Sequence, residues 1–138
     1  VRARALAKRL GDADLVIIDK RRAKANQSEV MNIIGECDGM NCIMMDDMVD
    51  TAGTLTRAAD LMMERGAVSV RAIASHPILS GAAYDRIEAS ALEELIVTDS
   101  IPLQKQSPKI KVVSCAPLFA DVMQKVQSNK SISGQFLM

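Results

Sequence analysis

The amino-acid sequence predicts an α/β domain with a doubly wound, mainly parallel sheet flanked by helices. Short apolar runs alternate with polar or amphipathic stretches along the chain, which is the order typical of this class. Residues 42–47 form an apolar run with little polar alternation, and such runs favour a parallel strand covered on both faces. The 138 residues, of which 49% are hydrophobic, suffice for one domain with its own core.

The first part of the chain predicts one helix and two strands. Residues 1–11 carry small and apolar side chains at helical spacing and reach a stop at Gly11, which favours a helix. Residues 14–19 and 29–35 are apolar and β-branched, so both are expected to be strands, the first of them buried. The polar, basic residues 20–28 are expected to form a loop.

The remaining elements alternate in the same way. Helices are predicted at residues 54–67, 80–90 and 116–129. Strands are predicted at residues 42–47, 68–76, 94–100 and 109–115. No capping residue precedes Val1, although it starts a predicted helix. We therefore expect residues 1–138 to be a single domain that is truncated at its N-terminal side.

Composition argues against several classes of function. The formal net charge is zero and only Tyr84, Phe119 and Phe136 are aromatic, so neither a basic nor a base-stacking nucleic-acid surface is indicated. No apolar run reaches the roughly 18 residues of a membrane span. The three cysteines form no CxxC pair, which favours a reducing compartment, such as the cytoplasm, over a disulfide framework or a zinc site.

Residues 46–54 follow a predicted strand and precede a predicted helix, where ligands bind in open α/β sheets. Thr51, Ala52 and Gly53 are small, so backbone N–H groups there can approach a ligand closely, and Gly53 is expected to supply a positive φ. Thr51 and Thr54 add hydroxyl donors, and the helix adds the positive end of its dipole. The pattern predicts a phosphate site, although the GK[ST] of the Walker motif is missing.

The two adjacent carboxylates of Asp46 and Asp47 need a different partner, because carboxylates repel phosphate. Ionised carboxylates accept hydrogen bonds from hydroxyls and bind hard cations such as Mg²⁺. A simpler interpretation is an ordinary turn in which Asp50 or Thr54 caps the helix. Two more carboxylates at the end of a buried strand would be costly in such a turn. We therefore favour a sugar-phosphate site.

The stretch IMMDDMVDTAGTL, residues 43–55, resembles the 5-phosphoribosyl-diphosphate loop of the phosphoribosyltransferase fold. The longer resemblance is to the family of ribose-phosphate diphosphokinases, or PRPP synthetases. It extends over nearly the whole chain and covers the C-terminal half of those enzymes. Among the segments that carry it are IDKRRAKAN (residues 18–26), SHPILSGAA (residues 75–83), VTDSIPL (residues 97–103) and NKSIS (residues 129–133).

The resemblance implies transfer of the diphosphoryl group of ATP to ribose 5-phosphate, with Mg²⁺ as cofactor. Lys20 and Arg22 match catalytic cations of a flexible loop, which would stabilise charge on the transferred group. Asp50, Thr51, Ala52, Gly53 and Thr54 match the loop that holds the 5-phosphate. Asp46 matches a ribose-binding acid, with Asp47 beside it.

The resemblance also implies a regulatory anion site at Ser80 and Gly81, for ADP or phosphate at a subunit contact, and a homo-oligomer that is a hexamer in the family. A helix cap is the simpler interpretation of Ser80. The chain has no counterpart of the family's N-terminal domain or of the acidic segment expected before Val1. Ala23 stands where a proline is common. We therefore expect the chain alone to have little or no synthetase activity.

Two other functions stay open at this point. A non-catalytic, synthetase-associated regulatory subunit would share the fold and could keep both the DKRR stretch and the acidic loop. A phosphoribosyltransferase would share the loop but usually carries a hood over its base, and no such segment is visible. The DKRR and SHPILSG stretches, residues 19–22 and 75–81, favour the synthetase.

Overall fold

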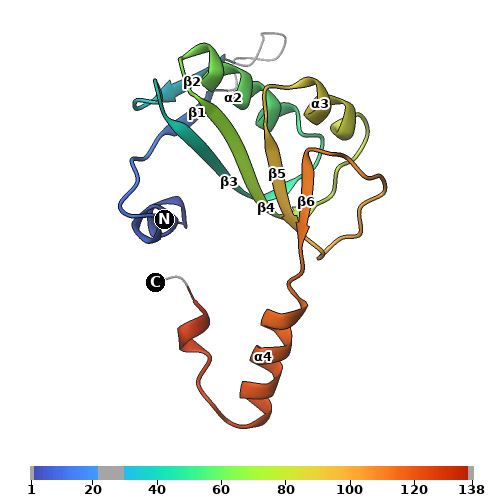
Figure 1. The fold of residues 1–138 in the computed structure, drawn as a ribbon. Helices are drawn as coiled ribbons and strands as arrows, with labels where there is room; N and C mark the ends of the chain where they lie inside the picture. The colour runs from blue at the N-terminus through green and yellow to red at the C-terminus, as the bar shows by residue number, and fades with distance from the viewer. Residues whose placement is uncertain (1, 22–29, 137–138) are drawn as a thin grey trace.

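A four-stranded parallel sheet forms the centre of the structure (Figure 1). The computed structural model describes residues 2–21 and 30–136. The strands cross the sheet in chain order, and they are β3 (Asn41–Val49), β4 (Ser69–Pro77), β5 (Glu94–Thr98) and β6 (Ile110–Val113). Each neighbouring pair runs in the same direction, so the predicted α/β class with a mainly parallel sheet is confirmed.

Two helices connect the strands and pack on the sheet. Helix α2 (Gly53–Glu64) joins β3 to β4, α3 (Ala83–Ala89) joins β4 to β5, and the two helices contact each other. Both connections step in the same direction across the sheet, so right-handed crossovers place both helices on one face. Val70, Ala72 and Ala74 of β4 are buried, whereas the residues between them are only half-buried. The core therefore lies between the sheet and these two helices.

Strand β3 differs from its prediction in length and in burial. It extends to Val49, and among the described residues it pairs only with β4, so it forms an edge of the sheet. Met44 is buried, but Ile43 and Met45 are 52% and 37% exposed. The prediction of a strand covered on both faces is therefore wrong. Ile43 and Met45 alternate with Met44 and so point to the opposite face, away from the side that α2 and α3 cover.

The two predicted strands near the N-terminus form a separate ribbon. Strand β1 (Ile17–Arg21) pairs antiparallel with β2 (Val30–Ile34), apart from the central sheet. Ile17 and Ile34, which face each other in the ribbon, are 60% and 56% exposed, so the prediction of a buried strand at residues 14–19 is wrong. A two-stranded ribbon has too little surface to cover both of its faces. Lys20 belongs to β1, not to a loop.

The remaining helices lie outside the core. They are α1 (Arg2–Arg9), α4 (Ala116–Gln127) and a 3₁₀ turn, η1 (Ser133–Gln135). Helix α4 follows β6 and extends away from the sheet (Figure 1), and none of its residues is buried. Within residues 2–21 and 30–136, no helix is both long enough and apolar enough to span a bilayer.

A carboxylate from the end of β5 holds the start of α4. Asp99 accepts hydrogen bonds from the backbone N–H of Cys115 at 2.8 Å and from its Sγ at 3.0 Å. Helix α4 has no side-chain cap of its own, so Asp99 supplies the negative charge that its N-terminus favours. The hydrogen bond from the Cys115 thiol, followed by one from Ser114, lowers the pKa of Asp99 to about 2. The same bond to Asp99 raises the pKa of the Cys115 thiol.

This carboxylate makes the stability of α4 depend on pH. The folded pKa of Asp99 lies below its ordinary value of 3.8, so the ionised form stabilises the helix above about pH 4 and this contribution is lost as the pH falls toward 2. Phe119 lies in the first turn of α4. Near pH 6, its backbone amide hydrogen is expected to exchange with solvent faster in the Asp99→Asn variant than in the original chain. The ratio of the two exchange rates should approach one near pH 2.

The control for this comparison is Asp85→Asn, which removes an exposed carboxylate from the first turn of α3. It should leave exchange at Phe119 unchanged at every pH. A rate ratio that is independent of pH for Asp99→Asn would show that its ionised carboxylate does not stabilise α4.

Candidate substrate-binding site

The predicted acids and loop lie together at the carboxyl end of β3. Asp46 and Asp47 are in the strand, residues 50–52 form the turn, and Gly53 and Thr54 begin α2. The neighbouring β4 ends at the same edge, since Val49 pairs with Pro77. The candidate site therefore occupies the position at which open α/β sheets bind ligands.

The residue with a positive φ is Ala52, which corrects the expectation for Gly53. Ala52 has φ 58° and ψ 1°, in the left-handed region, and is 5% exposed. Gly53 is the first residue of α2. An alanine in this conformation is strained by roughly 1 kcal/mol, and no local sequence signal marks it. Its carbonyl oxygen accepts hydrogen bonds from the N–H and the hydroxyl of Thr56, both at 3.0 Å.

Gly53 instead leaves space above the loop. A Cβ atom added there would meet nothing closer than Arg86 Nη1 and Thr51 Oγ1, both at 3.9 Å. An added methyl group would therefore be compatible with the fold. It would also lie in van der Waals contact with these two groups, at the first residue of α2.

The first turn of α2 has no side-chain cap. Ala52 is in the capping position, and within residues 2–21 and 30–136 no side-chain cap hydrogen bond is made there. The interpretation of Asp50 or Thr54 as an ordinary helix cap is therefore wrong. Asp50 accepts a short hydrogen bond from Ser80 Oγ instead. An uncapped helix start offers backbone N–H donors and a positive dipole end to an anion.

Ser80 belongs to the segment between β4 and α3. Helix α3 begins at Ala83 with no side-chain cap, so the interpretation of Ser80 as a helix cap is also wrong. Its hydroxyl donates to Asp50, and its backbone N–H donates to the carbonyl oxygen of Asp50 at 3.1 Å. Gly81 follows with φ 59°, and a Cβ atom added there would meet no other atom within 4 Å. The regulatory anion site at Ser80 and Gly81 stays a prediction.

Sequence reasoning missed Arg86. This residue of α3 donates from Nη1 to the carbonyl oxygen of Thr51 at 2.8 Å. The local sequence around Arg86 does not predict this contact, because its partner lies 35 residues earlier in the chain. The contact depends on the packing that brings the start of α3 beside the end of β3.

The two acids of β3 are exposed and close to each other. Asp46 Oδ1 accepts a hydrogen bond from the Asp47 backbone N–H at 2.8 Å. Within the described part of the chain, no group of three or more His, Cys, Asp or Glu residues could hold a metal ion. Successive residues of a strand point to opposite faces, so the two carboxylates point in different directions. Either carboxylate could share a Mg²⁺ ion with the phosphates of a ligand or accept hydrogen bonds from sugar hydroxyls.

The proposed catalytic pair is described only in part. Lys20 belongs to β1, and Arg22 lies outside the described residues. Their roles stay predictions from the resemblance. The lone histidine, His76, contacts Ser100 Oγ through its Nδ1 atom at 2.9 Å, at the end of β4. This contact agrees with the expectation of a residue at the end of a strand.

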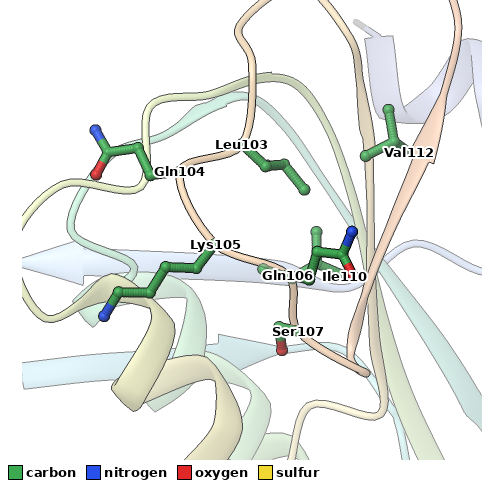
Figure 2. Close-up of a pocket in the computed structure, with 7 residues that line it drawn as sticks. All are labelled: Leu103, Gln104, Lys105, Gln106, Ser107, Ile110 and Val112. Carbon is green, nitrogen blue, oxygen red and sulfur yellow. The ribbon is translucent and has the colours of Figure 1, made fainter.

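Two cavities differ in their relation to this site. A groove of about 680 Å³ lies between α1, β3 and α2, and Asp46 and Thr54 are among the residues that line it. A smaller cavity of about 440 Å³ lies against the connection from β5 to β6, with Leu103, Lys105 and Ile110 around it (Figure 2). The smaller cavity contains none of the predicted site residues.

Fold and site together define an α/β domain in which an acidic strand end is followed by a short loop and by a helix start without a side-chain cap. The chain belongs to the phosphoribosyl synthetase-associated domain family, whose model matches residues 14–137. This finding confirms the resemblance that the sequence motifs suggested.

Individual relatives agree with the family. The chain is 56% identical over 135 residues to a ribose-phosphate pyrophosphokinase of Helicobacter hepaticus, covering 98% of this chain and 43% of the relative. It is 58% identical over 139 residues to a ribose-phosphate pyrophosphokinase of Bordetella pertussis, covering 99% of this chain and 44% of the relative. The chain thus spans less than half the length of these relatives.

A solved structure shows the same fold. The phosphoribosylpyrophosphate synthetase of Mycobacterium smegmatis matches with a TM-score of 0.84 and 35% identity, over 93% of this chain and 41% of that one. The match includes most of the chain, so the arrangement of β3, loop and α2 belongs to a fold that this synthetase shares.

Proposed function

We propose that the chain provides the ribose-5-phosphate site of a ribose-phosphate diphosphokinase. The observation that carries the proposal is the uncapped start of α2 directly behind two exposed strand-end acids. Backbone amides of residues 51–54 would bind the 5-phosphate, and Asp46 and Asp47 would bind ring hydroxyls or share a cation with the substrate. The names and identities of the relatives support the same reaction.

The reaction would transfer the diphosphoryl group of ATP to the anomeric hydroxyl of ribose 5-phosphate. The site would hold the sugar so that this hydroxyl stays oriented for attack, which lowers the entropic part of the barrier. Lys20 and Arg22 would place positive charge near the transferred group, where negative charge spreads in the transition state. Mg²⁺, when bound, would offset the charge of the phosphates.

The chain spans less than half of its relatives, so its share of the reaction is limited. We propose that ATP is bound chiefly by polypeptide that corresponds to the unmatched part of the relatives. The chain alone is then a sugar-phosphate-binding unit with little synthetase activity. The odd number of cysteines supports a reducing compartment such as the cytoplasm.

The effect of ligands on the melting temperature distinguishes sugar-phosphate binding by this chain from ATP binding. We expect ribose 5-phosphate to raise the melting temperature of the chain, because a ligand that binds only the folded state stabilises it by mass action. ATP with Mg²⁺ at the same concentration should raise the melting temperature less, and ribose without phosphate should have little effect. The melting temperature is measured by circular dichroism over a series of ligand concentrations.

Two results would contradict the proposal. A larger shift with ATP than with ribose 5-phosphate would place the main affinity in a nucleotide site. Near-normal turnover by the chain in an assay with ATP and ribose 5-phosphate would show that the unmatched part is not needed.

A further inference from the structure

The loop at the end of β3 is held by a second segment of the chain. The carbonyl oxygen of Val49 accepts the Leu79 N–H at 3.0 Å, and that of Asp50 accepts the Ser80 N–H at 3.1 Å. The Ser80 hydroxyl also donates to the Asp50 carboxylate. The connection from β4 to α3 therefore continues the pairing of β3 with β4 into the loop.

Both segments are strained at a non-glycine residue. Ala52 has φ 58° and Leu79 has φ 50°, and both side chains are buried, at 5% and 2% exposed. Left-handed conformations of such residues persist only where the surroundings fix them, and they gather at ligand-binding sites. The contacts that fix Ala52 are therefore part of what shapes the loop.

Arg86 contacts the peptide unit that precedes Ala52. Its Nη1 atom donates to the carbonyl oxygen of Thr51 at 2.8 Å, and this carbonyl shares a peptide unit with the Ala52 N–H. The structure contains no cis peptide among its described residues, so the N–H of that unit points opposite to its carbonyl. An arginine that fixes the Thr51 carbonyl thereby fixes the direction of the Ala52 amide.

We propose that Arg86 is a positioning residue of the substrate loop, which acts by orienting the peptide between Thr51 and Ala52. This inference rests on the proposed function, since the oriented amide belongs to the loop that would bind the 5-phosphate. Arg86 is exposed and lies on a helix that follows the site by more than 30 residues. Its side chain holds the loop in its binding conformation before the ligand arrives.

The test uses three variants of the chain. Arg86→Ala removes the donor, Arg86→Lys keeps a positive donor of similar length, and Arg71→Ala is the matched control. Arg71 carries the same charge and lies on β4, but its partner is Glu93 at 2.9 Å, away from the loop. Affinity for ribose 5-phosphate is measured by calorimetry, and the amide resonance of Ala52 is recorded by NMR without ligand.

Arg86→Ala is expected to bind ribose 5-phosphate about tenfold more weakly, because it loses a hydrogen bond from a charged donor. Its Ala52 resonance should already be displaced in the free protein. Arg86→Lys should recover part of both properties, and Arg71→Ala should match the original chain. If Arg86 only stabilised α3, its replacement by alanine would leave the Ala52 resonance unmoved.

Three results would overturn the inference. Equal affinity of Arg86→Ala and the original chain would show that the loop does not need this contact. Weaker binding with an unmoved Ala52 resonance would show that Arg86 acts on the ligand directly. Failure of the original chain itself to bind ribose 5-phosphate would remove the proposed function, and this inference with it.

Discussion

The Gly53→Ala variant is expected to bind ribose 5-phosphate about 10- to 100-fold more weakly than the original chain, which corresponds to losing one charge-assisted hydrogen bond. The added methyl group would lie 3.9 Å from both Thr51 Oγ1 and Arg86 Nη1, at the first residue of α2, whose amides would bind the phosphate under the proposed function. A phosphate oxygen must approach those amides to about 2.9 Å, and the methyl group would keep it away.

The fold should tolerate this substitution. Gly53 lies in the first turn of α2 and outside the left-handed region, and an alanine in a helix is more stable than glycine by up to about 1 kcal/mol. The variant is therefore expected to melt at the same temperature as the original chain or slightly higher. Loss of affinity without loss of stability would locate the effect in the binding space.

The matched control is Ala52→Gly at the neighbouring position. Glycine adopts the left-handed conformation of residue 52 without strain, so this variant should keep the shape of the loop and most of its affinity. Affinities of both variants are compared by calorimetry. Equal affinity of Gly53→Ala and the original chain would mean that the ligand does not approach residue 53.

The second large effect concerns the core. The Leu95→Ala variant is expected to lose about 3–5 kcal/mol of unfolding free energy, because it removes apolar contacts and leaves a cavity. Leu95 is 0% exposed, and its strand, β5, pairs with a neighbour on each side. A loss of this size is a large share of the roughly 5–15 kcal/mol that stabilises a typical domain.

The control for the core is Leu118→Ala on α4. Leu118 is 50% exposed, so its truncation should cost less than about 1 kcal/mol. Urea unfolding followed by circular dichroism compares the two, and the midpoint for Leu95→Ala should fall by about 2 M. Similar losses for the two variants would contradict the assignment of the core to the space between the sheet, α2 and α3.

Local sequence patterns were sufficient for the strands of the central sheet and for α4. The predicted strand at residues 68–76 corresponds to β4 (Ser69–Pro77), and the predicted helix at residues 116–129 corresponds to α4 (Ala116–Gln127). A helical spacing of apolar residues, or a continuous apolar run, identifies such an element without reference to the rest of the chain. Their boundaries differ by one to two residues, as is usual for helix and strand ends.

Features set by the order of the strands were not predictable in the same way. The apolar run that includes Ile43 and Met45 is typical of a covered strand, yet β3 is an edge strand among the described residues. The exposure of Ile17 follows in the same way from the pairing of β1 with β2 in a separate ribbon. The composition of a run does not say which strand becomes its neighbour.

The candidate site was predictable in its composition but not in its internal geometry. Asp46, Asp47 and residues 50–54 were proposed from residue type and order, and the structure brings them together at the end of β3. The left-handed conformation at Ala52 and the contact of Arg86 with Thr51 depend on the segment from β4 to α3, which lies about 30 residues further along the chain. Long-range contacts of this kind leave no local pattern.

The most direct test of the site is an NMR titration of the backbone amides of residues 51–54. Addition of ribose 5-phosphate is expected to shift the resonances of Gly53 and Thr54 in a saturable way, since their N–H groups would donate to the phosphate. Ribose at the same concentrations should leave them nearly unchanged. Unmoved Gly53 and Thr54 resonances at saturating ribose 5-phosphate, or equal shifts with ribose, would contradict the assignment of this loop to the phosphate.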